Sequence, residues 1–323
     1  MTLRDIASPV QLHLDRFDAI FRESMRSRIG LVDLVVRYLI RQKGKRVRPI
    51  LVFLSAEVCG GVTERSFRGA TLVEILHTAT LVHDDVVDDA DTRRGLPSIN
   101  AVWKNKIAVL MGDYLLARGL LLSLDKDDVD FLKITSSAVR RMSEGELHQI
   151  AKSRKLNMNE EDYLRIIGDK TASLFSTCCE IGATSATGER EKVRLLHEYG
   201  ELVGMAFQIR DDLLDYTGRT SITGKPVGLD LSEKKLTLPL VYALGKCPAS
   251  EKRTILSMIR RGGKGMKVGT ILDFVRARGG LEYADGRARD YAAQATERLS
   301  TLPPSPGRNA LEGFARFVVE REK

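Results

Sequence analysis

Aromatic residues and cysteines are both scarce in this sequence of 323 residues. Aromatic side chains make up 6% of the chain, and no stretch interleaves them with basic residues. A nucleic-acid-binding module is therefore not expected, because such modules combine a basic surface with stacking aromatics or a recognisable motif. The four cysteines form no C-x-x-C pair, which argues against a zinc site and against a disulfide framework. The adjacent Cys178 and Cys179 lie in an apolar helical stretch and are expected in the core.

The sequence also offers no secretory signal. The N-terminal stretch MTLRDIASPVQLHLDRF carries charges from its fourth residue onward and has no apolar core of the kind that signal peptides contain. No apolar run is expected to be long enough to span a bilayer. We therefore expect a cytoplasmic protein without a transmembrane segment, whose contact with a membrane would be limited to its basic surface.

The charge balance is basic. The formal net charge is +8 and the isoelectric point is about 9.3. Nucleic acid, an anionic membrane and small anionic substrates would all suit such a chain, and so would a basic surface that is merely solvated. The hydrophobic content of 43% and the charged content of 29% are ordinary for a globular protein with a large core.

Apolar residues recur with the helical period through most of the chain, and no alternating runs between tight turns indicate a sheet. We predict long helices over about 159–183 and 189–215. The stretch 107–124 is apolar almost all round, so a helix buried on most sides is expected there. The breaks are short and the apolar period resumes after each, so no domain linker is expected. The prediction is an all-α fold, a single helical-bundle domain over residues 1–323.

Two acidic clusters share the pattern D-D-x-x-D. They comprise Asp84, Asp85 and Asp88 in the first cluster and Asp211, Asp212 and Asp215 in the second. Residues four apart lie on one face of a helix, so Asp84 and Asp88 would repel each other unless a cation lay between them. Carboxylates without histidine or cysteine suit Mg²⁺, which keeps water and substrate phosphates in its shell. One cluster could be a solvated acidic face, but two within apolar stretches predict two halves of one magnesium site.

Basic residues flank these acids. Lys45, Arg46 and Arg48 fall within six residues at an expected helix start, and Arg93 and Arg94 follow the first acidic cluster. Guanidinium groups match phosphate oxygens with a planar fork of donors, and lysine acts as a point charge. Either basic cluster alone is better explained by solvent exposure. Together with acids that recruit a metal ion, they predict a site for a diphosphate.

His77 lies two helical turns before Asp84 on the same expected face. A buried histidine with a structural hydrogen bond is one explanation. Glu74 and His77 also form an E-x-x-H pair, which occurs in di-iron helical bundles. Such a site needs a second E-x-x-H pair, and none of the remaining histidines supplies one.

Five segments resemble a known family. They are GKRVRP (44–49), LHTATLVHDDVVDDADTRRG (76–95), GDKT (168–171), GMAFQIRDDLLDYTG (204–218) and GKPVGLDLSEKK (224–235). In their order and spacing they resemble the trans-isoprenyl diphosphate synthases, also called the polyprenyl synthetase family, and most closely its long-chain, octaprenyl-type members. The resemblance extends over roughly residues 10–320. It departs at Lys43, Lys234 and Leu236, where glycine or proline is frequent, which puts only loop geometry in doubt.

The resemblance implies an orthogonal helical bundle around a deep central cavity, a homodimer, and a site residue by residue. The implied ligands of Mg²⁺ are Asp84, Asp88, Asp211 and Asp215, with Asp85 and Asp212 beside them. The residues implied to hold the allylic diphosphate are Arg93, Lys170, Lys225 and Lys235. Those implied to hold isopentenyl diphosphate are Lys45, Arg48, His77 and Arg94, while Thr171 and Gln208 would line the reacting carbon.

The implied reaction is a head-to-tail condensation of isopentenyl diphosphate with an allylic prenyl diphosphate. Metal ions and basic side chains would neutralise the departing pyrophosphate, and the allylic bond would ionise to a carbocation. Thr171 and Gln208 would stabilise that cation in a pocket poor in water. The double bond of isopentenyl diphosphate would attack it, and the released pyrophosphate is the expected base.

Product length in such enzymes depends on the cavity below the first acidic cluster. Ala79 and Thr80 occupy the positions that would form its upper wall, and both are small. The residues expected to form a wall or floor lower down are Leu115, Leu116, Leu120 and Leu121. We therefore expect a medium- to long-chain product of the kind found in quinone side chains. A geranylgeranyl or farnesyl product is the alternative within the family, since neighbouring bulk could still block the cavity.

Two other classes share this resemblance. A non-catalytic subunit of a heteromeric prenyl synthase usually lacks one or more of the aspartates, whereas this chain keeps all six together with Arg93 and Arg94. A terpene cyclase or head-to-head condensing enzyme would not need Lys45 and Arg48 paired with His77. The sequence therefore favours an active chain-elongating enzyme.

Overall fold

Helices make up almost all of the fold. A computed structural model describes residues 1–42, 44–217, 228–262 and 267–321. Within these ranges the only strands are β1 (Thr92–Arg93) and β2 (Leu96–Pro97), which pair antiparallel. The α-helices are α1 (Leu3–Ala7), α2 (Gln11–Met25), α3 (Gly30–Arg41), α4 (Val47–Glu57), α5 (Glu64–Val87), α6 (Ile99–Leu124), α7 (Val129–Lys155), α8 (Glu160–Ile167), α9 (Ser173–Ala186), α10 (Arg190–Thr217), α12 (Leu229–Ser232), α13 (Leu238–Gly245), α14 (Ala249–Arg261), α15 (Val268–Ala277), α16 (Gly280–Arg298) and α17 (Pro306–Glu320). The predicted all-α fold is confirmed.

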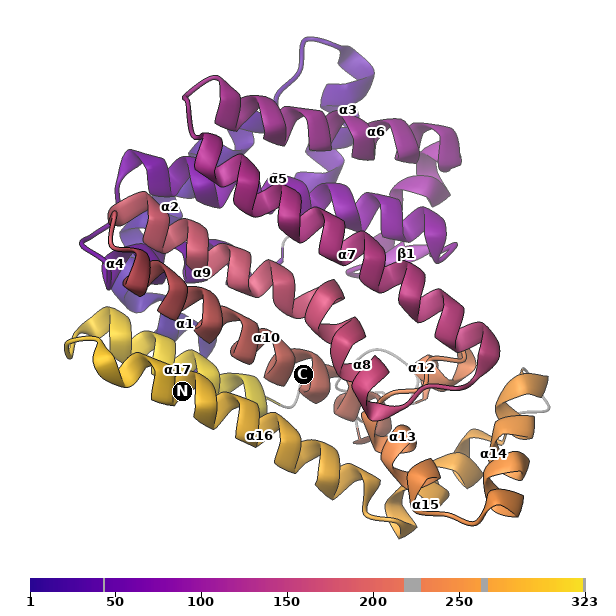
Figure 1. Ribbon diagram of the computed structural model, residues 1–323. Helices are drawn as coiled ribbons and strands as arrows, with labels where there is room; N and C mark the ends of the chain where they lie inside the picture. Colours follow the sequence, from indigo (N-terminus) through magenta and orange to yellow (C-terminus); the bar gives the residue numbers. More distant parts are fainter. Residues whose placement is uncertain (43, 218–227, 263–266, 322–323) are drawn as a thin grey trace.

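The long helices α5, α9, α10 and α16 pack one on the next, α7 packs on α9, and α6 packs on α5 at one edge (Figure 1). The shorter helices α13, α14 and α15 gather at one end. The largest buried cluster includes residues from Ile6 in α1 to Val319 in α17, so the two ends of the chain join the same core.

The two predicted central helices are confirmed within a few residues. The predicted helix over 159–183 corresponds to α8, a π-helical segment (Gly168–Ala172) and α9 in direct succession. The predicted helix over 189–215 corresponds to α10. Cys178 and Cys179 are fully buried on α9, as expected from their apolar surroundings.

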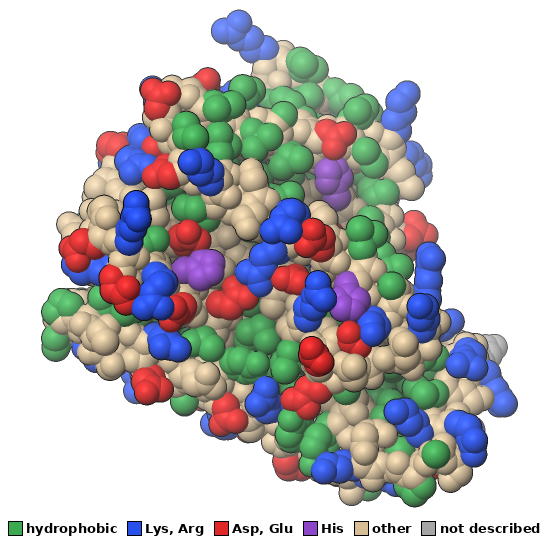
Figure 2. Space-filling view, in the orientation of Figure 1, with side chains coloured by type: hydrophobic (Ala, Val, Ile, Leu, Met, Phe, Trp, Pro, Cys, Tyr) green, Lys and Arg blue, Asp and Glu red, His purple; other side chains and the backbone are tan. Residues whose placement is uncertain are grey.

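The expectation that the helix over 107–124 is buried on most sides is wrong. This stretch belongs to α6, which packs on α5 with one face, while its large apolar side chains on other faces are exposed. The exposed residues are Val102, Val109, Leu110, Leu120, Leu121 and Leu124. Figure 2 shows hydrophobic side chains gathered over this edge of the molecule. The apolar composition was interpreted as burial, but a helix at the edge has neighbours on only part of its circumference.

The same helix bears on the expectation that no apolar run is long enough to span a bilayer. By length and composition α6 is long and apolar enough to cross a membrane, although a third of its most apolar 18-residue window is buried in the fold. The core helix of a soluble protein passes the same test, so this finding is weak evidence for a membrane span.

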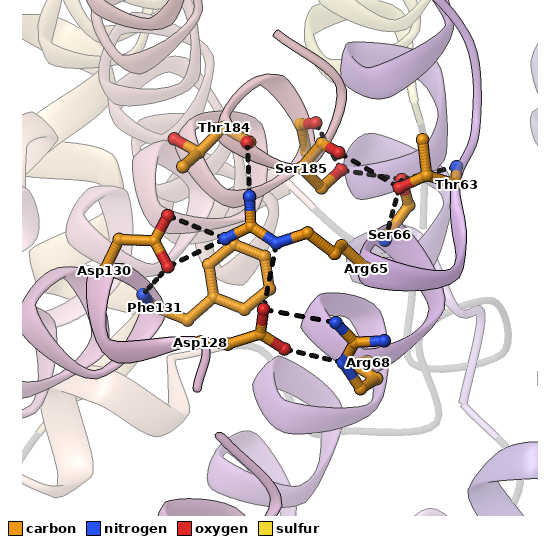
Figure 3. A network of polar contacts seen from close by, with 10 residues as sticks. Thr63, Arg65, Ser66, Arg68, Asp128, Asp130, Phe131, Thr184 and Ser185 are labelled. Carbon is orange, nitrogen blue, oxygen red and sulfur yellow. Dashed lines mark hydrogen bonds and ion pairs between the residues drawn. The ribbon is translucent and has the colours of Figure 1, made fainter. Parts of the chain in front are cut away.

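A buried ion-pair network ties the start of α5 to the start of α7 (Figure 3). The Asp128 side chain is 3% exposed, and its oxygens accept hydrogen bonds from Nε of Arg65 at 2.9 Å and from Nε of Arg68 at 2.6 Å. Arg65 also reaches Asp130 and the carbonyl oxygen of Thr184 at the end of α9. The two guanidinium groups lower the pKa of Asp128 against the opposing effect of burial.

A surface hollow of about 770 Å³ lies beside this network at the start of α5. Several of its charged side chains are already engaged: Arg65 binds Asp128, Arg194 binds Glu191, and His197 binds Glu180. Because the hollow lies at the start of α5 and the first acidic cluster lies at its end, the two are separate.

Candidate active site

The first acidic cluster occupies the last turn of α5. Asp85 is buried and accepts a hydrogen bond from Nε of Arg93 at 2.5 Å. Asp84 is partly buried and Asp88 is exposed at the C-cap of the helix. Burial raises the pKa of Asp84, and the negative charges of Glu146 and Asp88 act in the same direction, while Lys170 opposes them. A carboxylate in such surroundings favours a nearby cation.

A π-helical segment (Gly168–Ala172) places Lys170 near Asp84 of this cluster. π-Helical turns inside α-helices are rare and frequently mark functional sites. Lys170 forms an ion pair with Glu146 on α7. Glu146 was not selected from the sequence, because its place beside Lys170 depends on the packing of α7.

Two glycines allow the helices to approach this segment. A Cβ atom at Gly204 on α10 would lie 2.5 Å from Cα of Ala172, and one at Gly145 on α7 would lie 3.1 Å from the backbone nitrogen of Lys170. Real Cβ contacts below 3.0 Å essentially do not occur. The position of Lys170 and Thr171 therefore depends on the absence of a side chain at Gly204, whereas a Cβ atom at Gly145 would need its neighbours to move by only a few tenths of an ångström.

The second acidic cluster lies near the end of α10. Hydroxyl and amide groups form a chain of hydrogen bonds: Thr171 donates to Oε1 of Gln208 at 2.8 Å, and Nε2 of Gln208 donates to Oδ1 of Asp212 at 2.6 Å. The Tyr163 hydroxyl donates to Oδ2 of Asp212 at 2.7 Å. Both oxygens of Asp212 are thus engaged. Burial, followed by the charge of Asp230, raises the pKa of Asp212 well above its usual range.

The other two aspartates of this cluster have different surroundings. Asp211 is more than half exposed and pairs with Arg321 at 3.1 Å. Asp215 accepts hydrogen bonds from the backbone nitrogens of Leu229 and Asp230, at 3.1 and 3.2 Å. Burial, followed by the negative charge of Asp215, raises the pKa of Asp230 to about 6. Asp230 and Tyr163 were missed in the sequence, since neither lies within a D-D-x-x-D pattern.

A polar cavity of about 110 Å³ joins several of the predicted residues. Its wall contains Lys170, Thr171, Gln208, Asp212 and Lys235, together with Asp230. Lys235 lies one residue after Lys234, whose φ of 60° is left-handed. Glycine adopts that conformation readily, which explains why a glycine would suit position 234. Lys225 lies outside the described residues.

A basic pocket lies beside the first acidic cluster. The cavity between α3 and α5 is lined by His77, Asp85, Arg93 and Arg94, among others. Nη1 of Arg94 donates to the carbonyl oxygen of Gln42 at 2.7 Å, and a Cβ atom at Gly44 would collide with this guanidinium.

His77 is buried in the wall of this pocket and 8% exposed. Its pKa lies well below the usual range because of burial and because of the nearby Arg48 and Arg94. His77 is therefore neutral and can offer the pocket a hydrogen bond but no charge. Lys45 is exposed and Arg48 is partly buried at the same end of α4.

A small apolar cavity of about 10 Å³ continues below His77. Its walls come from α5, α7 and α9, and the lining residues are Leu76, His77, Thr80, Thr135, Ala138, Val139, Met142, Leu174 and Thr177. Of the two residues predicted to line a product tunnel, Thr80 faces this cavity. Ala79 is 2% exposed and belongs to the cluster between α5 and α6.

The expectation of a tunnel floor formed by α6 is not met. Leu115 is fully buried, but it packs in the cluster that contains Ala79 and Met111. Leu116 is partly buried against the core, and Leu120 and Leu121 are exposed on the outside. None of these leucines lines the cavity, whose lower wall is formed by α7 and α9.

The structure places both acidic clusters near the same basic side chains. The positive charge of Lys170 lowers the pKa of Asp84 in the first cluster. Its neighbour Thr171 donates a hydrogen bond to Gln208, which in turn binds Asp212 of the second cluster. Burial lowers the pKa of Lys235, but its hydrogen bond to Glu233 and the charges of Glu233, Asp88 and Asp230 raise it overall. Among the described residues, no three His, Cys, Asp or Glu side chains are close enough to hold a metal ion by themselves. The available donors are carboxylate oxygens, which suit a divalent ion that is completed by water and phosphate.

Comparison with known proteins decides the family. A family model described as polyprenyl synthetase matches residues 30–275. The chain belongs to the polyprenyl synthetase family. It is 37% identical over 319 residues to the all-trans-nonaprenyl-diphosphate synthase (geranyl-diphosphate specific) of Rhodobacter capsulatus, covering 98% of each chain. It is 35% identical to the octaprenyl diphosphate synthase of Escherichia coli, covering 95% of each chain.

A solved structure supports the same assignment. The polyprenyl synthase of Caulobacter crescentus, complexed with calcium and isoprenyl diphosphate, superposes with a TM-score of 0.93 at 34% identity, covering 100% of this chain and 98% of that one. The protein is therefore a prenyltransferase of this family. The family uses divalent metal ions, which fits the carboxylate donors of the two acidic clusters.

Replacing Gly204 by Ala should impair catalysis, because the new Cβ atom would push the π-helical segment and displace Lys170 and Thr171. We expect the rate of chain elongation to fall by about tenfold or more and the free energy of unfolding to fall by about 1–3 kcal/mol. Steady-state kinetics and urea unfolding would measure both. Gly286→Ala is the control, since nothing lies within 4 Å of that position on α16. A Gly204→Ala protein with the rate of the control would contradict this explanation.

Proposed function

We propose that this protein is a magnesium-dependent polyprenyl diphosphate synthase that extends an allylic prenyl diphosphate with isopentenyl diphosphate to a medium- or long-chain product. The observation that carries the proposal is a basic pocket and an apolar cavity that share the wall formed by α5, together with the polar cavity, whose Lys170 lies near Asp84 at the end of α5. His77 lines both the basic pocket and the apolar cavity. The charged head groups and the growing hydrocarbon chain would thus bind in neighbouring cavities.

The allylic diphosphate would lie between the two acidic clusters. Asp84, Asp88 and Asp211 have carboxylate groups that are not fully engaged by buried hydrogen bonds, so they are the favoured ligands for Mg²⁺. Bound Mg²⁺ would neutralise charge on the departing pyrophosphate. Lys170 and Lys235 lie in the wall of the same cavity and would bind the phosphate oxygens. Lys225 remains a predicted contact to this diphosphate.

The carbocation would form next to Thr171 and Gln208. The hydrogen bond from Thr171 leaves its hydroxyl oxygen lone pairs available, and Gln208 is held in place by its bond to Asp212. Oriented dipoles stabilise a developing positive charge without reorganisation at the moment of reaction. Asp212 would contribute by orienting Gln208 and not by binding metal directly.

Isopentenyl diphosphate would occupy the basic pocket. Arg48, Arg94 and Lys45 would bind its diphosphate, and neutral His77 would add a hydrogen bond. Arg93 is already bound to Asp85, so it links the basic pocket to the first acidic cluster. No described carboxylate or histidine stands out as a dedicated base, which supports the released pyrophosphate in that role.

The apolar cavity supports elongation beyond short products, as do the octaprenyl and nonaprenyl products in the names of the relatives. The cavity is small, so a growing chain would have to move flexible side chains such as Met142. Thr80 and Ala138 are small residues in its walls, and neither closes it with an aromatic ring.

Purified protein incubated with Mg²⁺, isopentenyl diphosphate and farnesyl diphosphate should give products longer than geranylgeranyl diphosphate after dephosphorylation and sizing. Asp84→Ala should reduce turnover by at least about 100-fold with the fold intact, because it removes a metal ligand. The far-ultraviolet circular dichroism of the variant serves as the control for folding. No elongation with any allylic primer would overturn the proposed function, and a product that stops at geranylgeranyl would overturn only the chain length.

Thr80→Phe should shorten the products, since an aromatic ring would enter the narrow apolar cavity below His77. Product sizing would detect the change, with substrate concentrations kept well above saturation. Val87→Phe is a matched control on the same helix, because Val87 is 61% exposed. An unchanged product distribution in Thr80→Phe would show that the chain grows along another path.

The exposed apolar face of α6 supports the expected homodimer. A contiguous exposed patch of large aliphatic residues commonly marks a protein interface. The residues concerned are Val109, Leu110, Leu120, Leu121 and Leu124. Light scattering should therefore give twice the chain mass of 35.9 kDa, and Leu121→Glu should shift the protein to monomers. A wild-type monomer at micromolar concentration would refute the dimer. A cytoplasmic location is also part of the proposal.

A further inference from the structure

Glu74 is a carboxylate that neither acidic cluster contains and that the proposed reaction does not use. It lies on α5, one helical turn before His77. Two small cavities, of about 60 and 30 Å³, both have Glu74 in their walls, and both also share Gln42 and Arg94. Glu74 therefore lies at the inner boundary of the basic pocket.

Three arginines surround this carboxylate. Arg46 and Arg48 stand at the start of α4, and Arg94 follows β1. Glu74 is the leading negative charge for Arg48 and Arg94, and it also acts on Arg46, which forms an ion pair with Asp18. The arginines lower the pKa of Glu74 in return, but burial outweighs them and raises it.

Hydrogen bonds do not fully satisfy the carboxylate of Glu74. Among the described residues, the buried Oε2 of Glu74 has no hydrogen-bond partner, and neither has the buried Nε of Arg48. Asp128 provides the contrast, because Arg65 and Arg68 bind both of its oxygens. A buried carboxylate with a purely structural role is usually bound in that manner. Because Nε of Arg48 and Oε2 of Glu74 lack hydrogen-bond partners, the arginines can exchange the carboxylate for another anion.

We propose that Glu74 is a displaceable countercharge of the isopentenyl diphosphate pocket, which neutralises the arginines while the pocket is empty and takes up a proton when the diphosphate binds beside them. The inference rests on the proposed function for the identity of the anion. Its reason is electrostatic: an ionised carboxylate next to a bound diphosphate would be a like charge in a region shielded from water. The proton comes from solvent, and no covalent bond to the substrate changes.

The other groups near Glu74 cannot take this role. The charged and titratable side chains around it are Asp18 and Arg22 on α2, Arg46 and Arg48 at α4, His77 and Asp85 on α5, Arg93 and Arg94 after β1, and Cys178 on α9. Asp18 is paired with Arg46, and Asp85 is bound to Arg93. His77 is already neutral because its pKa is well below the usual range, and burial keeps the thiol of Cys178 protonated by raising its pKa. Glu74 is the remaining acid whose charge can respond.

Isothermal titration calorimetry of isopentenyl diphosphate binding to the full chain tests the proposal. EDTA is present throughout, so that the metal-dependent site does not bind the ligand. Wild type and Glu74→Gln are compared across neutral pH in buffers of different ionisation enthalpy, which report proton uptake. Wild type should take up more protons than the variant. Glu74→Gln should bind about 3- to 10-fold more tightly at the alkaline end, and the difference should shrink toward acid pH. Titration of the ligand itself is common to both proteins and cancels.

Two controls accompany this comparison. Glu74→Asp keeps the charge and should retain the proton uptake of wild type. Glu64→Gln removes a carboxylate from the same helix that is exposed and paired with Arg16, and it should behave as wild type. Thermal unfolding should show that empty Glu74→Gln is less stable than wild type and that isopentenyl diphosphate narrows the gap, because the ligand replaces the lost charge.

Equal proton uptake in wild type and Glu74→Gln would overturn the proposal, as would weaker binding by Glu74→Gln. If Glu74→Gln does not fold, infrared difference spectra of wild type decide: ligand binding should produce a band of a protonated carboxyl group, and its absence would contradict the role. Failure of isopentenyl diphosphate to bind wild type would count against the proposed substrate. The same comparison with inorganic pyrophosphate would then test the countercharge by itself.

Discussion

Carboxylates inside an apolar bundle impose the strongest constraint on this structure, because a buried ion without partners is costly. The middle aspartate of each acidic cluster is the buried one. Asp85 is bound by Arg93, and Asp212 is bound by Tyr163 and Gln208. These bonds fix the ends of α5 and α10. The flanking aspartates of the clusters are left partly or fully exposed, where they can meet a metal ion and a diphosphate.

Close helix packing sets the rest of the site. The π-helical segment (Gly168–Ala172) lies between α7 and α10, and Gly145 and Gly204 provide the space for it. Lys170 and Thr171 therefore reach the acidic clusters from backbone that neighbouring helices hold on both sides. Binding and catalytic groups on rigid elements keep their geometry better than groups on loops. Residues 218–227, which include Lys225, lie outside the described residues.

Periodicity predicted the all-α fold and the long central helices, which the structure confirms, while the residues expected around the diphosphates came from the family resemblance and stay a prediction. The errors share one physical cause. Apolar composition reports that a helix has apolar faces but not how many neighbours it has, so α6 was expected to be buried although its outer face is exposed. For the same reason Leu120 and Leu121 were expected in a cavity wall. Ala79 and Thr80 are adjacent and similar in size, yet one packs on α6 and the other faces the apolar cavity.

The sequence by itself determined which chemistry is available, since the paired aspartates, the flanking arginines and their spacing on helices follow from residue types and the helical repeat. Only the tertiary structure decided how these groups are used. Asp212 is engaged by Tyr163, Lys170 by Glu146, and Glu74 lies among three arginines from distant segments. Each of these pairings joins residues from separate elements of the fold. Their energies depend on burial and on partners that only the packing of the whole chain brings together.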